Sequence, residues 1–142
     1  MSELLRVADA VTSALNSAAL SLPFTAERQY LPQFDLAEMK DLHVTVVPRG
    51  VEVSQAARAK GTFDYKVDVA VQKKFEKGDA AELDPLMDLA GEIAELFRAK
   101  RLDEFPEAAW VKTEHAPVYA QEHMQELRQF TGVLTLTFRV VR

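Results

Sequence analysis

Residues 62–72 of the chain read TFDYKVDVAVQ, and this stretch decides the fold. Every second residue from Phe63 to Val71 is apolar, and the residues between them are mostly polar or charged. Because successive side chains of a strand point to opposite faces, the pattern predicts a strand with one buried face and one wet face. The run from Phe130 to the last residue alternates in the same way, so it predicts a second long strand.

The segments around these strands complete an α+β domain. Strands are also predicted over residues 24–31, 42–48 and 108–114, with Phe34 to Asp41 as a connector in which Asp35 is a possible helix cap. Apolar residues spaced by three and four predict a helix over residues 2–20, capped by Ser2. A second helix is predicted to begin at Asp84–Pro85.

The predicted order is α-β-β-β-α-β-β, in one domain that spans residues 1–142. Each helix has one apolar stripe, so we expect both to pack on one face of a mainly antiparallel sheet of about five strands.

Composition narrows the classes of function. With 48% hydrophobic and 27% charged residues, the 142-residue chain is neither disordered nor low in complexity. The absence of cysteine excludes disulfides, thiolate metal sites and cysteine nucleophiles. A net charge of −5 argues against a general nucleic-acid binder, and no apolar run approaches the length of a membrane span. The N-terminal stretch does not look like a signal peptide.

The sequence offers few candidates for catalysis. Histidines stand at positions 43, 115 and 123, and the pairs Glu114–His115 and Glu122–His123 lack the i, i+4 spacing of a helical zinc site. No serine lies in a glycine-flanked elbow, and the glycines are single, so no phosphate-binding loop is present. Gly91 in the second helix predicts a close approach to the sheet. We therefore expect no catalytic, metal-binding or cofactor-binding residues and no cofactor, and we expect the chain not to be an enzyme.

The alternative is a small cytosolic ligand-binding or enzymatic α+β domain. In that case the sheet would form the floor of a pocket, with Trp110 and Tyr65 as aromatic walls and His115 as the titratable group.

Basic residues mark the candidate interaction surfaces. The segment Arg49–Lys60 has no buried periodicity, so we expect an exposed, mobile loop, with a solvated hairpin tip as the alternative. It carries Arg49, Arg58 and Lys60, and a second basic group follows the long strand, at Lys73, Lys74 and Lys77. The acidic stretch from Glu76 to Asp84 is the candidate for the opposite charge. The C-terminal strand is either an edge strand that another subunit could cover or a central strand paired on both sides.

Four stretches together resemble a family of small phage and prophage tail proteins. They are RQYLPQFDLAEMKDLHVTVVPRG (Arg28 to Gly50), YKVDVAVQKKF (Tyr65 to Phe75), LDPLMDLAGEIAELF (Leu83 to Phe97) and PVYAQEHMQELRQFTGVLTLTFRV (Pro117 to Val140). These proteins are similar in size and element order to tail terminator and tail-completion proteins, which join tail and head. The resemblance covers most of the chain but carries no catalytic motif.

The resemblance implies a structural role in virion assembly. Such proteins have a small sheet flanked by helices and assemble as a ring on the tail tube, where the ring stops tube growth and offers a surface to the head. The implied partners are other copies of the chain, the tail tube and head or neck proteins, with no nucleic-acid specificity and no membrane. The implied location is the virion tail, and the host cytoplasm during assembly. By position, the assembly surfaces would be the Arg49–Lys60 loop and the strand from Phe130.

Overall fold

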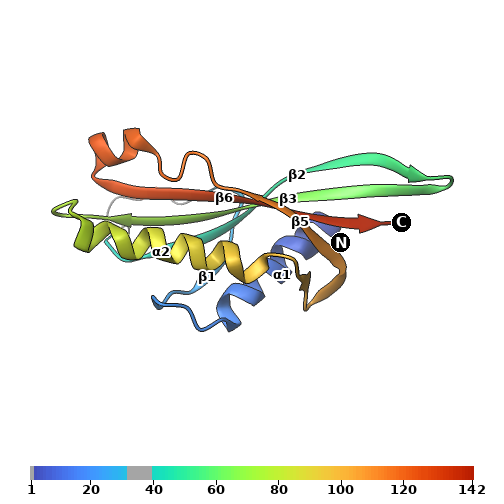
Figure 1. The fold of residues 1–142 in the computed structure, drawn as a ribbon, viewed down its shortest axis with the longest axis horizontal. Coiled ribbons are helices and arrows are strands. Elements are labelled where there is room, and N and C mark those ends of the chain that lie inside the picture. Colours follow the sequence, from blue (N-terminus) through green and yellow to red (C-terminus); the bar gives the residue numbers. More distant parts are fainter. Residues whose placement is uncertain (1, 32–39) are drawn as a thin grey trace.

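The computed structural model describes residues 2–31 and 40–142. In this part of the chain the strands form one six-stranded sheet, curled into a half-barrel, in the order β1-β2-β3-β6-β5-β4 (Figure 1). The strands are β1 (Ala26–Arg28), β2 (His43–Ala57), β3 (Lys60–Lys74), β4 (Arg101–Leu102), β5 (Phe105–Glu114) and β6 (Gln129–Val141). The helices are α1 (Glu3–Ser17), α2 (Ala80–Phe97) and a short π-helix, η1 (His123–Leu127).

The core lies between the sheet and the two α-helices, which cover the same face (Figure 1). The alternation predicted for β3 is present, since Tyr65, Val67, Val69 and Val71 are buried in this core. β6 runs antiparallel to β3 over its whole length and adds a second apolar row to the same face. Fully buried side chains of the two helices and β6 close the core: Val7, Val11, Leu89, Ile93, Leu134, Leu136 and Phe138.

The α+β class is confirmed, but the predicted sheet is wrong in two details. It has six strands rather than about five, because the two-residue strand β4 pairs with β5 at the far edge. It is also mixed, because β1 runs parallel to β2, pairing Ala26 with Val44 and Arg28 with Val46. Strands of two or three residues are too short to show alternation, and a parallel partner leaves no local signal in the sequence.

The predicted loop over Arg49–Lys60 is strand for most of its length. β2 continues to Ala57, paired along β3 from Val51↔Tyr65 to Ala57↔Lys60, and only Arg58 and Ala59 form the turn. The segment lacks a buried period because every residue from Val51 to Lys60 is exposed. Its conformation therefore comes from the backbone hydrogen bonds to β3 rather than from an apolar face.

The start of α2 and the capping bond of α1 differ from the prediction. The α2 helix starts at Ala80, and its cap is Asp79, whose side chain accepts a hydrogen bond from the Glu82 N–H, so Pro85 lies inside the helix rather than at its start. Ser2 stands at the N-cap of α1 but makes no side-chain cap bond. The α1 helix ends at Ser17, and the predicted connector with Asp35 lies largely outside the described residues.

β6 is a central strand. It pairs with β3 on one side and with β5 on the other, so the edge-strand alternative for the C-terminal run is wrong. Within residues 2–31 and 40–142, β2 beyond Val46 and the part of β5 beyond β4 each lack a neighbouring strand on one side.

Candidate functional site

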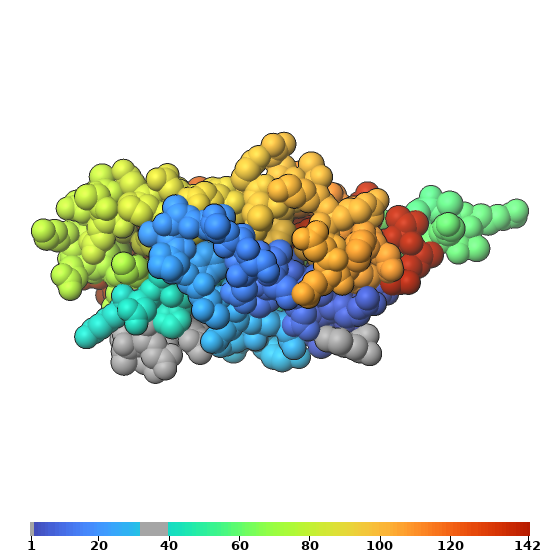
Figure 2. All heavy atoms as spheres, turned by 90° about the horizontal axis from the view of Figure 1, so that it is seen from below, coloured from blue at the N-terminus to red at the C-terminus, as the bar shows by residue number. Residues whose placement is uncertain are grey.

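The hairpin of β2 and β3 extends past the helices as a narrow projection, which we call the arm and define as residues 51–60 (Figures 1 and 2). Val51 and Val53 are 47% and 61% exposed. Both lie opposite aromatic residues of β3, in the pairs Val51↔Tyr65 and Val53↔Phe63, so they face the same side of the sheet as the helices. The arm thus exposes apolar side chains on a strand whose outer edge has no neighbouring strand in the described chain.

The three predicted basic residues of this segment do not form one patch. Arg58 and Lys60 lie together at the tip of the arm, next to Ala59 with its left-handed φ of 62°. Arg49 lies about 30 Å away along the strand. There its Nη1 is 3.3 Å from the Asp68 carboxylate and 3.2 Å from the Thr135 hydroxyl, on the sheet face opposite the helices.

The second predicted group, Lys73, Lys74 and Lys77, lies at the other end of β3, about 40 Å from the tip of the arm. Sequence reasoning missed Arg128, which joins this basic end from the start of β6. The Arg128 guanidinium lies 5.5 Å from the centroid of the Phe75 ring and donates a hydrogen bond to the Glu76 carbonyl. Arg128 reaches this end of β3 through a contact that is distant in the sequence, so the residues next to Arg128 give no sign of it.

The acidic stretch after β3 serves the local turn. The Glu82 carboxylate accepts hydrogen bonds from the backbone N–H groups of Glu76, Lys77 and Gly78 at 2.9, 2.9 and 2.8 Å. These hydrogen bonds, led by that from Glu76, lower the pKa of Glu82. Glu82 is therefore a structural acceptor that joins the end of β3 to α2, rather than a free acidic contact.

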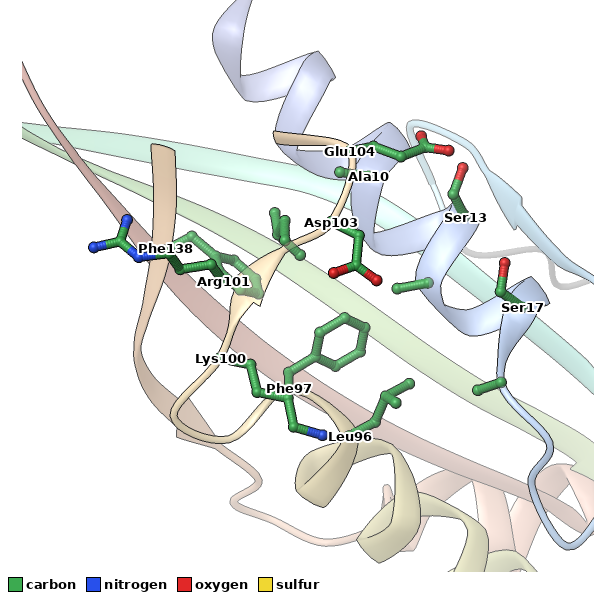
Figure 3. A pocket seen from close by; sticks show the side chains of 13 residues that line it. Ala10, Ser13, Ser17, Leu96, Phe97, Lys100, Arg101, Asp103, Glu104 and Phe138 are labelled. Atoms are coloured by element: carbon green, nitrogen blue, oxygen red, sulfur yellow. The ribbon is translucent and has the colours of Figure 1, made fainter. Parts of the chain in front are cut away.

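A groove lies between α1 and the segment that joins α2 to β4 and β5, with a volume of about 310 Å³ (Figure 3). We call it the helix groove. One wall consists of small side chains of α1, and the floor includes the Phe97 and Phe138 rings, which meet edge to face with centroids 6.0 Å apart. Asp103 and Glu104 stand on the opposite wall, and in the described chain neither makes an ion pair or a side-chain hydrogen bond. The small side chains are Ala10, Ser13, Ala14, Ser17 and Ala18.

The sheet face opposite the helices carries paired charges. Arg139 holds the Asp64 carboxylate at 2.8 Å, which raises the pKa of Arg139, and Lys66 lies 3.2 Å from Glu52. Such pairs at a surface stabilise the fold only slightly. As a result, these acidic side chains already have basic partners within the chain.

His115 and His123 each make a hydrogen bond within the fold. The Nε2–H group of His115 donates to the Val118 carbonyl at 2.9 Å, because a carbonyl can only accept. His123 Nδ1 is 2.8 Å from the Thr131 hydroxyl. Within the described residues, no three acidic, histidine or cysteine side chains are placed to hold a metal ion.

The residues of the alternative pocket do not meet around a cavity. Trp110 and Tyr65 both pair with Phe138 from opposite sides, and Tyr65 is buried in the core. His115 lies beyond the end of β5. Neither described α-helix has both the length and the hydrophobicity needed to cross a bilayer.

No protein-family model matches the sequence, and no curated protein sequence matches it. Among solved structures, the fold is similar to a chain of the virion of a native gene transfer agent particle, with a TM-score of 0.53 and 14% identity over 99% of this chain and 90% of that one. The sheath/tube terminator of an extracellular contractile injection system, in its extended state, aligns with a TM-score of 0.47 and 14% identity over 100% of this chain and 57% of that one. The first likeness confirms, at the level of the fold, the resemblance to components of phage-like particles that the sequence predicted.

Proposed function

We propose that the chain is a structural part of the tail of a phage-like particle, a tail terminator or tail-completion protein. The observation that carries this proposal is the fold shared with a virion chain over nearly the whole length of both proteins, together with the resemblance in sequence. At 14% identity the likeness concerns the architecture alone, so the position of the chain within the tail is our proposal.

In this role the chain assembles into a ring-like homo-oligomer that caps the tail tube and offers a surface to head or neck proteins. A ring needs two different surfaces on each copy, because a head-to-tail contact closes only when unlike patches meet. The arm and the basic end lie at opposite ends of the long β3 strand, so they can face different neighbours. The proposed contact residues are Arg49, Arg58, Lys60, Lys73, Lys74 and Lys77.

The proposed role is structural rather than enzymatic. The prominent surfaces are a projecting strand pair with exposed valines and clusters of cations, which suit recognition of another protein. The protein acts in the virion tail after assembly in the host cytoplasm.

Two measurements test the proposal together. Light scattering and negative-stain imaging of the purified chain should reveal closed rings, and particles made without its gene should have tails of abnormal length or tails without heads. A strictly monomeric protein at high concentration, combined with normal tailed particles in its absence, would refute the proposal.

A further inference from the structure

We propose that the arm of one copy docks in the helix groove of a second copy of this chain. The inference rests on the proposed self-association and names the surfaces that make the contact. The arm and the helix groove are different patches, so their contact is head to tail and can propagate around a ring.

The arm has the features of a strand that is covered in the working assembly. Val51 and Val53 are well exposed, and the outer edge of β2 past Val46 has no strand beside it in the described chain. Natural proteins protect such edges with proline, charge or a partner, because free N–H and C=O groups invite pairing. Between Val53 and Ala57 the chain has no proline and no charged residue.

The helix groove matches the tip of the arm in size. The tip is a two-residue turn, Arg58–Ala59, and its smallest face is the Ala59 methyl group. The α1 wall of the groove presents only alanine and serine side chains, so a backbone turn can approach the helix closely. A volume of about 310 Å³ holds one such turn with a long side chain.

The charges of the two surfaces are complementary. Arg58 and Lys60 make no ion pair within the described chain, and neither do Asp103 and Glu104 at the groove. Figure 3 shows the Asp103 carboxylate pointing into the groove, whereas the Arg101 guanidinium points away from it and donates to the Pro106 carbonyl. Lys100 also lines the groove, and it runs along the end of α2 near Leu96.

Both halves of the contact belong to the same chain, and this favours a second copy as the occupant. The protein carries a net charge of −5, so the two cations at the tip of the arm give this surface a charge opposite to that of the protein as a whole. The unpaired carboxylates of the groove would attract that tip and slow its release.

Cysteine cross-linking tests the contact directly, because the chain contains no cysteine. We expect a mixture of Ala59→Cys and Ser17→Cys variants to form disulfide-linked dimers under mild oxidation. Ala59→Cys mixed with Lys112→Cys, which lies outside the groove, should form none. Cross-linking in both mixtures alike, or in neither while rings are present, would overturn the arm–groove contact.

Charge reversal provides the second test. Arg58→Glu/Lys60→Glu should weaken self-association about tenfold or more, and Asp103→Lys/Glu104→Lys should do the same. A mixture of the two variants should recover association, since both arm–groove pairings between unlike copies are again complementary. Lys40→Glu/Lys112→Glu makes the same change of charge outside the arm and the helix groove and should leave association unchanged.

The outcomes separate this inference from the proposed function. If wild-type rings form and both reversals leave their affinity intact, the arm–groove contact is wrong while self-association stands. If wild-type protein forms no oligomer, the ring itself is refuted, and this contact falls with it.

Discussion

The two turns that flank α2 each hold a residue in the left-handed region. At both turns we expect glycine to give a more stable protein than alanine. Gly78, before the helix, has φ 71°, and Ala99, after it, has φ 58°. We expect Ala99→Gly to stabilise the protein and Gly78→Ala to destabilise it. The reason is that an L residue with a Cβ atom is strained at positive φ, whereas glycine is not.

The magnitudes follow from the local geometry. Left-handed backbone costs alanine about 1–2 kcal/mol, and glycine loses about 0.5–1 kcal/mol more conformational free energy on folding, so Ala99→Gly should gain about 0.5–1 kcal/mol. Gly78→Ala reverses that balance and adds a contact, because the new Cβ would lie 3.0 Å from the Phe75 ring. Phe75 is nearly buried and also contacts Arg128, so the ring has little room to move. The sum is a loss of about 1–2 kcal/mol.

Urea unfolding measures these differences in the free energy of unfolding, provided that its dependence on urea concentration is the same for all variants. The melting temperature should shift by about 3 °C per kcal/mol for a chain of 142 residues. Gly91→Ala is the matched control, since Gly91 is exposed within α2 and an added Cβ meets no atom within 4 Å. Helix propensity alone predicts a gain of about 1 kcal/mol there. If Gly78→Ala proved as stabilising as Gly91→Ala, the argument from the left-handed turn would be refuted.

Further predictions concern buried and hydrogen-bonded groups. Gln72→Met should raise the free energy of unfolding by about 1 kcal/mol in urea titration, because both amide atoms of Gln72 are buried without a partner in the described structure; a loss of stability would contradict this. Phe138→Ala should lower it by about 3–5 kcal/mol, since the side chain is fully buried against Phe97, and a loss below 1 kcal/mol would count against the packing described. The lowered pKa of Glu82 means that its carboxylate stabilises the fold above the unfolded pKa and that this contribution disappears as pH falls through the folded pKa. Glu82→Gln should therefore be less stable than wild type at pH 7 and equal to it under acid conditions, as unfolding midpoints at the two pH values would reveal, whereas a difference independent of pH would exclude this role.

The sequence was most informative where a buried face repeats. Alternation in β3 and β6 and the apolar stripes of the two α-helices predicted the core, because burial on one face imposes a period on the residues. The glycine in α2 misled for a related reason. Gly91 suggested a close approach to the sheet, but it lies on the exposed face, where no neighbouring atom requires glycine.

Features that depend on contacts distant in the sequence could not be predicted. The outer part of β2 is strand only because β3 pairs with it, and the parallel pairing of β1 leaves no periodic signal. The candidate site depends on the same kind of contact. Asp103 and Glu104 read as ordinary turn residues until α1 is seen across the groove, and Arg128 joins the basic end only through the fold.

The place of β3 between β2 and β6 also bears on how the chain folds during synthesis. β2 can form a hairpin with β3 as soon as both have left the ribosome, but the other side of β3 waits for a strand whose contacting residues, such as Arg139 for Asp64, are 75 positions later. Contacts of that sequence separation form slowly. Until β6 emerges, the nascent chain therefore holds a long strand with one unpaired edge, and slowing translation within residues 75–128 should increase aggregation more than slowing it within residues 1–40.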